Sequence, residues 1–226
     1  INSNEPYFKN IFYGFRPSVM KSHKTLYIIL AAFAIFGISL QVYMPYYIIY
    51  LQNAGLHIDF ASQIGFDSYV IIMAPAIIVA AVFTMLYGKV IDKFGFIKSV
   101  IPTLITYGIG LLLLTFLKGA IGMFIGCLLM MCGYLASTAC FNAVIRKYTP
   151  SDKVGLFQGL RIVASVLIPM LIGPWIGSTI CGGGALFGVA TDERFSVSPY
   201  VFLGGLIFIL LIVVPLIFVK DENKQK

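Results

Sequence analysis

The side chains best suited to bind a polar ligand gather on one apolar stretch of this sequence. The stretch SLQVYMPYYIIY carries Tyr43, Tyr47 and Tyr50 at i, i+4 and i+7, so the three phenols share one face of a helix. Gln41 lies two residues before them. Amide and hydroxyl groups beside aromatic faces suit a hydroxylated or otherwise polar neutral ligand, and we predict Gln41, Tyr43 and Tyr47 as lining residues. The alternative, an aromatic belt at a membrane surface, explains Tyr50 well and Gln41 poorly.

Weaker ligand-binding candidates occur on later apolar stretches. Asn142 and Trp175 could also line a site, but Asn142 lies near one end of its stretch, where it could instead cap a helix or pack. A hydroxyl such as that of Ser137 more often bonds its own helix backbone.

Residues for covalent chemistry or metal binding do not cluster. All nine acidic residues and both histidines lie outside the apolar stretches. Cys127, Cys132 and Cys140 lie inside one stretch without a neighbouring base, where cysteine behaves as a small hydrophobe. An enzyme would need a nucleophile with a base, a metal constellation or paired carboxylates at one depth. We therefore expect no enzymatic activity, no metal and no other cofactor.

The composition indicates a membrane protein. Of the 226 residues, 59% are hydrophobic and only 11% are charged, whereas about a quarter of the residues of a soluble domain are charged. A net charge of +7 would suggest nucleic acid as the partner of a soluble protein. Here the charges stand at the ends of apolar runs, where they orient a chain in a bilayer. We expect an integral membrane protein, in the plasma membrane, without a nucleic-acid partner.

Six apolar stretches are long enough to cross a bilayer, which takes about twenty residues of helix. Backbone groups in lipid have no water to bond, so these stretches must be helical, and the fold is predicted to be all-α. Residues 1–25 would form a cytoplasmic linker or interfacial segment, 26–219 the transmembrane domain and 220–226 a cytoplasmic tail. The expected spans are 26–51, 68–87, 99–117, 120–145, 162–181 and 199–219.

The basic residues alternate between the two sides that these spans define. Of the sixteen Lys and Arg residues, only Lys118 and Arg194 fall on the second side, which leaves fourteen on the first. Cytoplasmic loops carry the excess of positive charge. We therefore expect the first side, and with it both termini, to face the cytoplasm.

The turn GKVIDKFGFIK, between the second and third spans, resembles the signature of the major facilitator superfamily. That signature reads Gly, three residues, Asp, a basic residue, any residue, Gly and two basic residues. Gly88, Asp92, Lys93 and Gly95 match it in register and at the expected loop. Phe and Ile follow Gly95 where basic residues are usual, and second-half copies of this signature are commonly degenerate.

Two further stretches resemble the same family. RKYTPSDKVGLFQGLR, from Arg146 to Arg161, is similar to the loop between the fourth and fifth helices of a facilitator's second half, and PMLIGP is similar to its kinked fifth helix. The resemblance implies two six-helix halves, each of two inverted three-helix repeats, with the substrate between the halves. The chain starts at Ile1 without an initiator Met, so we expect a C-terminal half whose partner is the N-terminal half.

The resemblance also implies a cytoplasmic gate. Asp92 would pair with Arg146 and face a helix N-terminus of the other half, which would stabilise the state closed to the cytoplasm, and Arg161 would belong to the same gate. The alternative is an exposed Asp that balances the neighbouring Lys charges.

Prolines interrupt two of the ligand-lining helices. Pro45 leaves a backbone carbonyl of the first span without its helical donor and permits a bend. Pro169, Gly173 and Pro174 are predicted to form a kink that lets the fifth helix bend during gating, with tight helix packing as the alternative.

These observations predict half of a secondary active or facilitative transporter that moves a small polar organic solute, sugar-like by preference, by alternating access. Because the spans contain no acid, a symporter would need its coupling acid in the other half; otherwise the carrier is a uniporter. The alternatives are a six-helix channel or interaction subunit acting as a homo-oligomer, and a membrane-embedded enzyme. An isolated half is expected to self-associate through its first, second, fourth and fifth spans.

Overall fold

The computed structural model describes residues 17–53, 67–151, 154–182 and 197–219, and the regular elements in these ranges are all helices. Residues 1–16 of the predicted linker segment and the whole predicted tail 220–226 lie outside the described residues. The elements are α2 (Pro17–Ser22), α3 (Lys24–Asn53), α5 (Ser68–Phe94), α6 (Phe96–Phe116), α7 (Ala120–Tyr148), α8 (Val154–Ile162), η3 (Val163–Leu167), α9 (Ile168–Ile180) and α10 (Tyr200–Ile217).

Within these described ranges, six helical stretches are long and apolar enough to cross a membrane, which confirms the predicted all-α fold with six spans. They are α3, α5, α6, α7, the continuous run α8–η3–α9, and α10. Five of them are longer than predicted, and the second and the fifth are extended most. The second continues to Phe94 and the fifth begins at Phe157, because a helix continues past its apolar run until a residue stops it. At the end of α5 that residue is Gly95, whose φ of 80° lies in the left-handed region.

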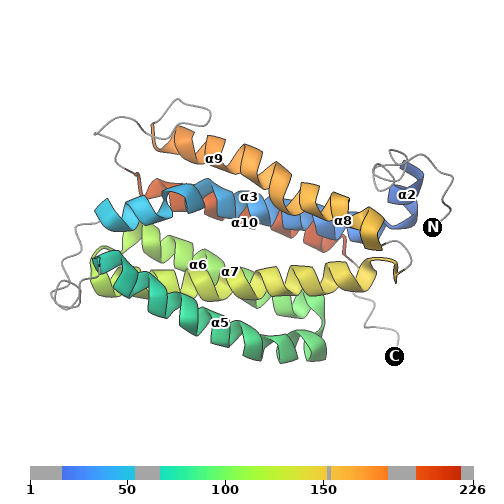
Figure 1. Cartoon of the computed structure of the whole chain (residues 1–226), viewed down its shortest axis with the longest axis horizontal. Helices are drawn as coiled ribbons and strands as arrows, with labels where there is room; N and C mark the ends of the chain where they lie inside the picture. The colour runs from blue at the N-terminus through green and yellow to red at the C-terminus, as the bar shows by residue number, and fades with distance from the viewer. Residues whose placement is uncertain (1–16, 54–66, 152–153, 183–196, 220–226) are drawn as a thin grey trace.

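The spans form two layers (Figure 1). In the first layer α9, α3, α7 and α5 lie side by side in that order, with α3 packed against α9 and α7 packed against α5. In the second layer α10 packs behind α3 and α6 packs behind α7, and α6 and α10 also contact each other. The first layer leaves α5 and α9 at opposite edges of the molecule.

The packing has the two-fold relation expected of inverted repeats. Exchanging α3 with α7, α5 with α9 and α6 with α10 converts each large contact into another one. The contact of α3 with α9 becomes that of α7 with α5, and the contact of α10 with α3 becomes that of α6 with α7. The three helices α3, α5 and α6 therefore form one repeat, and α7, the α8–η3–α9 run and α10 form the other.

Glycines allow the closest crossings between the layers. A Cβ on Gly110 of α6 would strike the backbone of Met130 in α7, and a Cβ on Gly133 of α7 would strike the backbone of Tyr107. Small residues let membrane helices approach until their backbones touch, where van der Waals contact stabilises the pair.

Consecutive spans run in opposite directions, so the start of α3, the α5–α6 turn, the α7–α8 connection and the end of α10 lie at one end of the bundle (Figure 1). We call this the basic end. Of the described Lys and Arg residues, only Lys118 lies at the opposite end. The basic end carries Lys21, Lys24, Lys89, Lys93, Lys98, Arg146, Lys147 and Arg161.

Candidate functional site

Gln41 lies near the middle of α3, on the side that meets α9. A Cβ added to Gly173 of α9 would strike the Cβ and the carbonyl carbon of Gln41, so the two helices touch here. The Gln41 side chain is half-buried and has no hydrogen-bond partner among the residues that the structure describes. Pro45 has no N–H to give to the Gln41 carbonyl. The side-chain amide and the backbone carbonyl of Gln41 are therefore both available for hydrogen bonds at the same depth, close to the middle of the span.

The predicted tyrosine stripe does share one face of α3, and that face turns into the bundle. Tyr43 and Tyr47 are 0% and 2% exposed. Tyr107 of α6 donates a hydrogen bond to the Tyr43 hydroxyl at 3.1 Å, and Tyr47 donates to the sulfur of Cys127 in α7 at 2.9 Å. Tyr50 donates to a backbone carbonyl of α6. These hydroxyls connect α3 to its neighbours, and the ligand-lining role of Tyr43 and Tyr47 stays a prediction.

The weaker ligand candidates lie apart from Gln41. Trp175 is 51% exposed and stands two residues after Gly173, so it projects from α9 on the side away from α3. Ser137 does not bond its own backbone: it donates to the Thr103 hydroxyl of α6 at 2.9 Å. Asn142 lies further along α7, at the basic end.

The signature turn is a single residue long. Gly95 alone separates α5 from α6, and its left-handed φ permits the tight connection. Asp92 and Lys93 are exposed on the last turn of α5, with the Lys93 ammonium 5.5 Å from the ring centre of Phe94. A Cβ on Gly88 would meet nothing within 4 Å among the described atoms, so this side of α5 is open.

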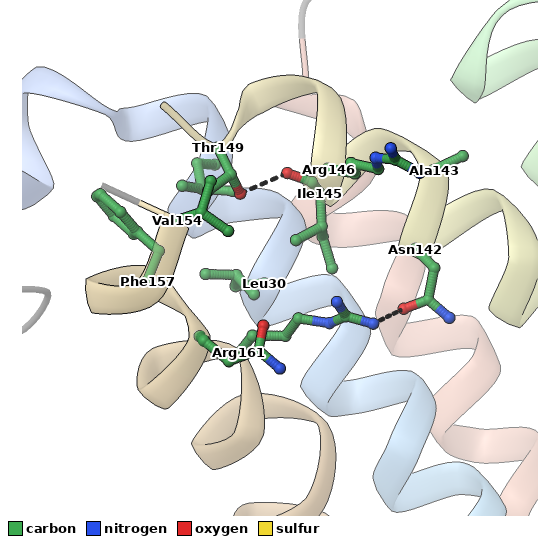
Figure 2. A pocket seen from close by; sticks show the side chains of 11 residues that line it. Leu30, Asn142, Ala143, Ile145, Arg146, Thr149, Val154, Phe157 and Arg161 are labelled. Carbon is green, nitrogen blue, oxygen red and sulfur yellow. Dashed lines mark hydrogen bonds between the residues drawn. The ribbon is translucent and has the colours of Figure 1, made fainter. Parts of the chain in front are cut away.

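A pocket of about 640 Å³ opens at the basic end between α3, α7 and α8 (Figure 2). Arg161 of α8 donates a hydrogen bond to the Asn142 Oδ1 of α7 at 2.7 Å, which holds the guanidinium group across the pocket. The lining mixes this polar pair with apolar side chains from α3. The lining residues are Leu26, Leu30, Asn142, Ala143, Ile145, Arg146, Thr149, Val154, Phe157, Gln158 and Arg161.

The structure does not bring the predicted gate pair together. Arg146 lines the pocket near the end of α7, while Asp92 is exposed near the end of α5. Neither forms an ion pair with any residue in the described part of the chain. Both side chains are at the basic end and open to contacts from outside this unit.

The fifth span changes helix type just before its first proline. Pro169 has no N–H for the carbonyl of Ser165, and the Ile168 N–H bonds the Val163 carbonyl five residues back, which makes η3 a short π-helix. Further on, Gly173 packs directly against α3. Tight packing is therefore present at Gly173, and bending of this span during transport stays a prediction.

Pro174 has a contact of its own with the first span. Its carbonyl accepts a hydrogen bond from the Tyr46 hydroxyl of α3 at 3.1 Å. The Pro169 ring in turn fits against Gly37, where a Cβ would be 2.5 Å from the ring carbon Cγ. The predicted kink residues of α9 thus lie along its contact with α3.

Sequence reasoning missed two polar residues of the pocket. Gln158 and Thr149 line it together with Asn142 and Arg161. Gln158 precedes Arg161 by three residues, and this helical spacing was the available signal. Thr149 gave none, because its hydroxyl bonds the Ile145 carbonyl and so behaves as an ordinary helix-end threonine.

Taken together, these groups can form hydrogen bonds and pair with an anion. In the described ranges no three His, Cys, Asp or Glu side chains come close enough to hold a metal ion. The described cysteines have no disulfide partner, and three of them are buried. The hydrogen-bonding and charged groups described above are suited to binding a polar molecule.

Comparison with known proteins gives one finding. The family model described as Major Facilitator Superfamily matches residues 29–226, which is most of the chain. No curated protein and no solved structure matches.

Proposed function

The chain belongs to the major facilitator superfamily, and from that premise we propose that it is one half of a transporter for a small polar organic solute. The proposed solute is neutral and sugar-like in its hydroxyl groups, and it moves by alternating access between this half and a second six-helix half. The observation that carries the proposal is Gln41, whose amide has no partner in the described chain and stands beside a carbonyl that Pro45 cannot bond. A polar group that deep in a membrane is costly unless something binds it.

The burial of the spans supports a missing partner half. Of the 18 most apolar consecutive residues of each span, 61% are buried inside this unit in α3, compared with 17% in α5 and 22% in the fifth span. These two spans form the edges of the first layer (Figure 1). We propose that the first layer faces the partner half, with the substrate between them. The same exposed spans would make an isolated unit self-associate.

The basic end supplies the proposed gate. Asp92, Arg146 and Arg161 lie at the ends of three different helices there, and no ion pair among the described residues occupies them. Contacts that must form and break during transport are best made between halves and not within one half. We propose that these charges pair with the other half when the cytoplasmic side closes.

The test is solute uptake by cells that express the full-length transporter. Gln41→Leu keeps a similar side-chain length and removes the amide, so uptake of the transported solute should fall about tenfold or more, as expected for a lost buried hydrogen bond. Gln52→Leu is the matched control, because Gln52 is exposed near the end of the same helix. It should leave uptake unchanged.

Surface expression of both variants is measured in parallel. Normal uptake by Gln41→Leu at normal surface expression would remove Gln41 from the substrate path and with it the proposed polar solute.

A further inference from the structure

A groove runs along the back of the molecule between α6 and α10. It has a volume of about 620 Å³, and every residue that lines it is Ile, Leu, Val or Gly. It begins at the basic end beside Ile97 and Val219 and reaches past Gly108 and Leu206.

The groove faces away from the proposed partner half. α6 and α10 form the second layer, and α3 and α7 lie between them and the face on which a second half would dock (Figure 1). In a transmembrane bundle this back surface meets the bilayer. Its occupant is therefore a hydrophobic molecule of the membrane or another protein within the membrane.

The length of the groove suits an acyl chain. On α6 it extends from Ile97 to Leu112, a distance of fifteen residue steps that rise about 22 Å at about 1.5 Å each. One leaflet of the hydrocarbon core is about 15 Å thick. An acyl chain whose headgroup is held at the basic end could therefore lie in the groove through the full thickness of that leaflet.

A charge stands at the mouth of the groove. Lys98 is exposed on the first turn of α6, and it shares a face of that helix with Ile101 and Ile105, which line the groove at i+3 and i+7. An ammonium group at the membrane surface attracts an anionic headgroup. An apolar groove with a lysine at its surface end matches the two parts of an anionic phospholipid.

We propose that the α6–α10 groove binds one acyl chain of an anionic phospholipid whose phosphate contacts Lys98. A second copy of the protein fits the groove less well. Two parallel copies related by a two-fold axis along the membrane normal would bring one Lys98 toward the other at the same depth, and like charges across an interface are unfavourable. This inference rests on the membrane embedding of the bundle and does not depend on the transported solute.

The experiment is native mass spectrometry of the purified full-length transporter, released from micelles that contain phosphatidylglycerol or phosphatidylcholine with identical acyl chains. The wild-type protein should retain phosphatidylglycerol about fivefold better than phosphatidylcholine, the preference expected for one lysine at an anionic surface. Lys98→Gln should retain both lipids equally. Lys89→Gln, an exposed lysine of α5 at the same end, is its matched control and should keep the preference.

A second variant tests the groove itself. A Cβ on Gly108 would meet the side-chain tips of Leu206 at 3.2 Å and Ile209 at 3.9 Å, so Gly108→Leu fills the groove once these flexible tips shift aside. The Gly108→Leu variant should lose both lipids. Gly159→Leu, which adds the same side chain in open space on α8, should retain them.

Three outcomes would overturn the proposal. The first is equal retention of the two lipids by the wild-type protein, and the second is unchanged retention by Gly108→Leu. The third is a dimer that Gly108→Leu dissociates, which would identify a second copy of the protein as the occupant.

Discussion

Tyr107 connects three helices through hydroxyl groups inside the bundle. Its own hydroxyl donates to Tyr43 of α3 at 3.1 Å and lies 3.3 Å from the Ser39 hydroxyl. Ser39 donates in turn to the Gly205 carbonyl of α10 at 2.7 Å. Both tyrosines and the serine are 0% exposed, so no water replaces a bond that is lost. The network stabilises the contact between the two layers.

Removing the central hydroxyl should therefore reduce stability. Tyr107→Phe leaves the Tyr43 hydroxyl without its donor, which costs about 1–2 kcal/mol and should lower the melting temperature of the purified transporter by about 2–5 °C. Tyr200→Phe is the control, because Tyr200 is 61% exposed. A thermal-shift series measures both. Equal melting temperatures for Tyr107→Phe and wild type would show that the network contributes little.

Residue types and spacing predicted which side chains share a face of α3, and the structure confirms that face for the tyrosines. They could not predict which neighbour the face would meet. The donor to Tyr43 is Tyr107, 64 residues away in the chain, and periodicity within one helix has no information on such a partner. The pair of Asp92 and Arg146 was expected from the family resemblance. Both residues lie at the predicted end of the bundle, but the resemblance did not show that they remain apart within this half.

At the scale of elements, the crossing of α3 with α9 depends on missing side chains. A Cβ on Gly177 would strike the Val42 carbonyl and the ring of Tyr46. Neither neighbour can move without displacing α3, since one is backbone and the other is a buried ring.

Gly177→Ala should therefore destabilise the protein by about 1–3 kcal/mol, the usual cost of overpacking. The matched variant is Gly155→Ala on α8, where a Cβ would meet nothing within 4 Å. It should instead stabilise the helix by up to about 1 kcal/mol, because alanine is the better helix former. Melting temperatures of the two purified variants should thus shift in opposite directions. A neutral Gly177→Ala would mean that the two helices can separate at no cost.

Span positions followed from hydropathy because a bilayer leaves a chain no other regular structure than a helix or a closed barrel. Span ends did not. The end of α5 is set by the backbone of Gly95 and the start of the fifth span by amphipathic α8, and an apolar count registers neither. The π-helix before Pro169 was also beyond prediction. A missing N–H indicates a disturbance of the helix but does not determine its form.

At the scale of the whole molecule, the inverted repeat is present in the packing and shows no clear echo in the sequence. The two outer helices show why. α6 crosses α7 at Gly110, and its counterpart α10 crosses α3 at Gly205, so each repeat places a glycine where backbones must touch. At the other positions, any apolar side chain of suitable size packs equally well against lipid or core, so the sequences of the two repeats can differ there.

The orientation of the molecule in its membrane can be tested on one helix. Lys98 and Lys118 are both exposed and lie at opposite ends of α6, whose 21 residues span about 30 Å, the thickness of the hydrocarbon core. If the basic end is cytoplasmic, a membrane-impermeant maleimide added to intact cells should label Lys118→Cys. It should reach Lys98→Cys only after the cells are permeabilised.

The cysteines of this chain add little background labelling, since Cys127, Cys132 and Cys140 are buried and Cys181 can be replaced by serine. Labelling of Lys98→Cys in intact cells, with Lys118→Cys protected, would reverse the orientation. The basic residues would then lie outside, and Asp92, Arg146 and Arg161 would gate the external side of the transporter. The same bundle would then sit in the membrane in the reverse orientation. The two-fold relation between its repeats allows either end of the fold to face the cytoplasm, and only the charges distinguish the two ends.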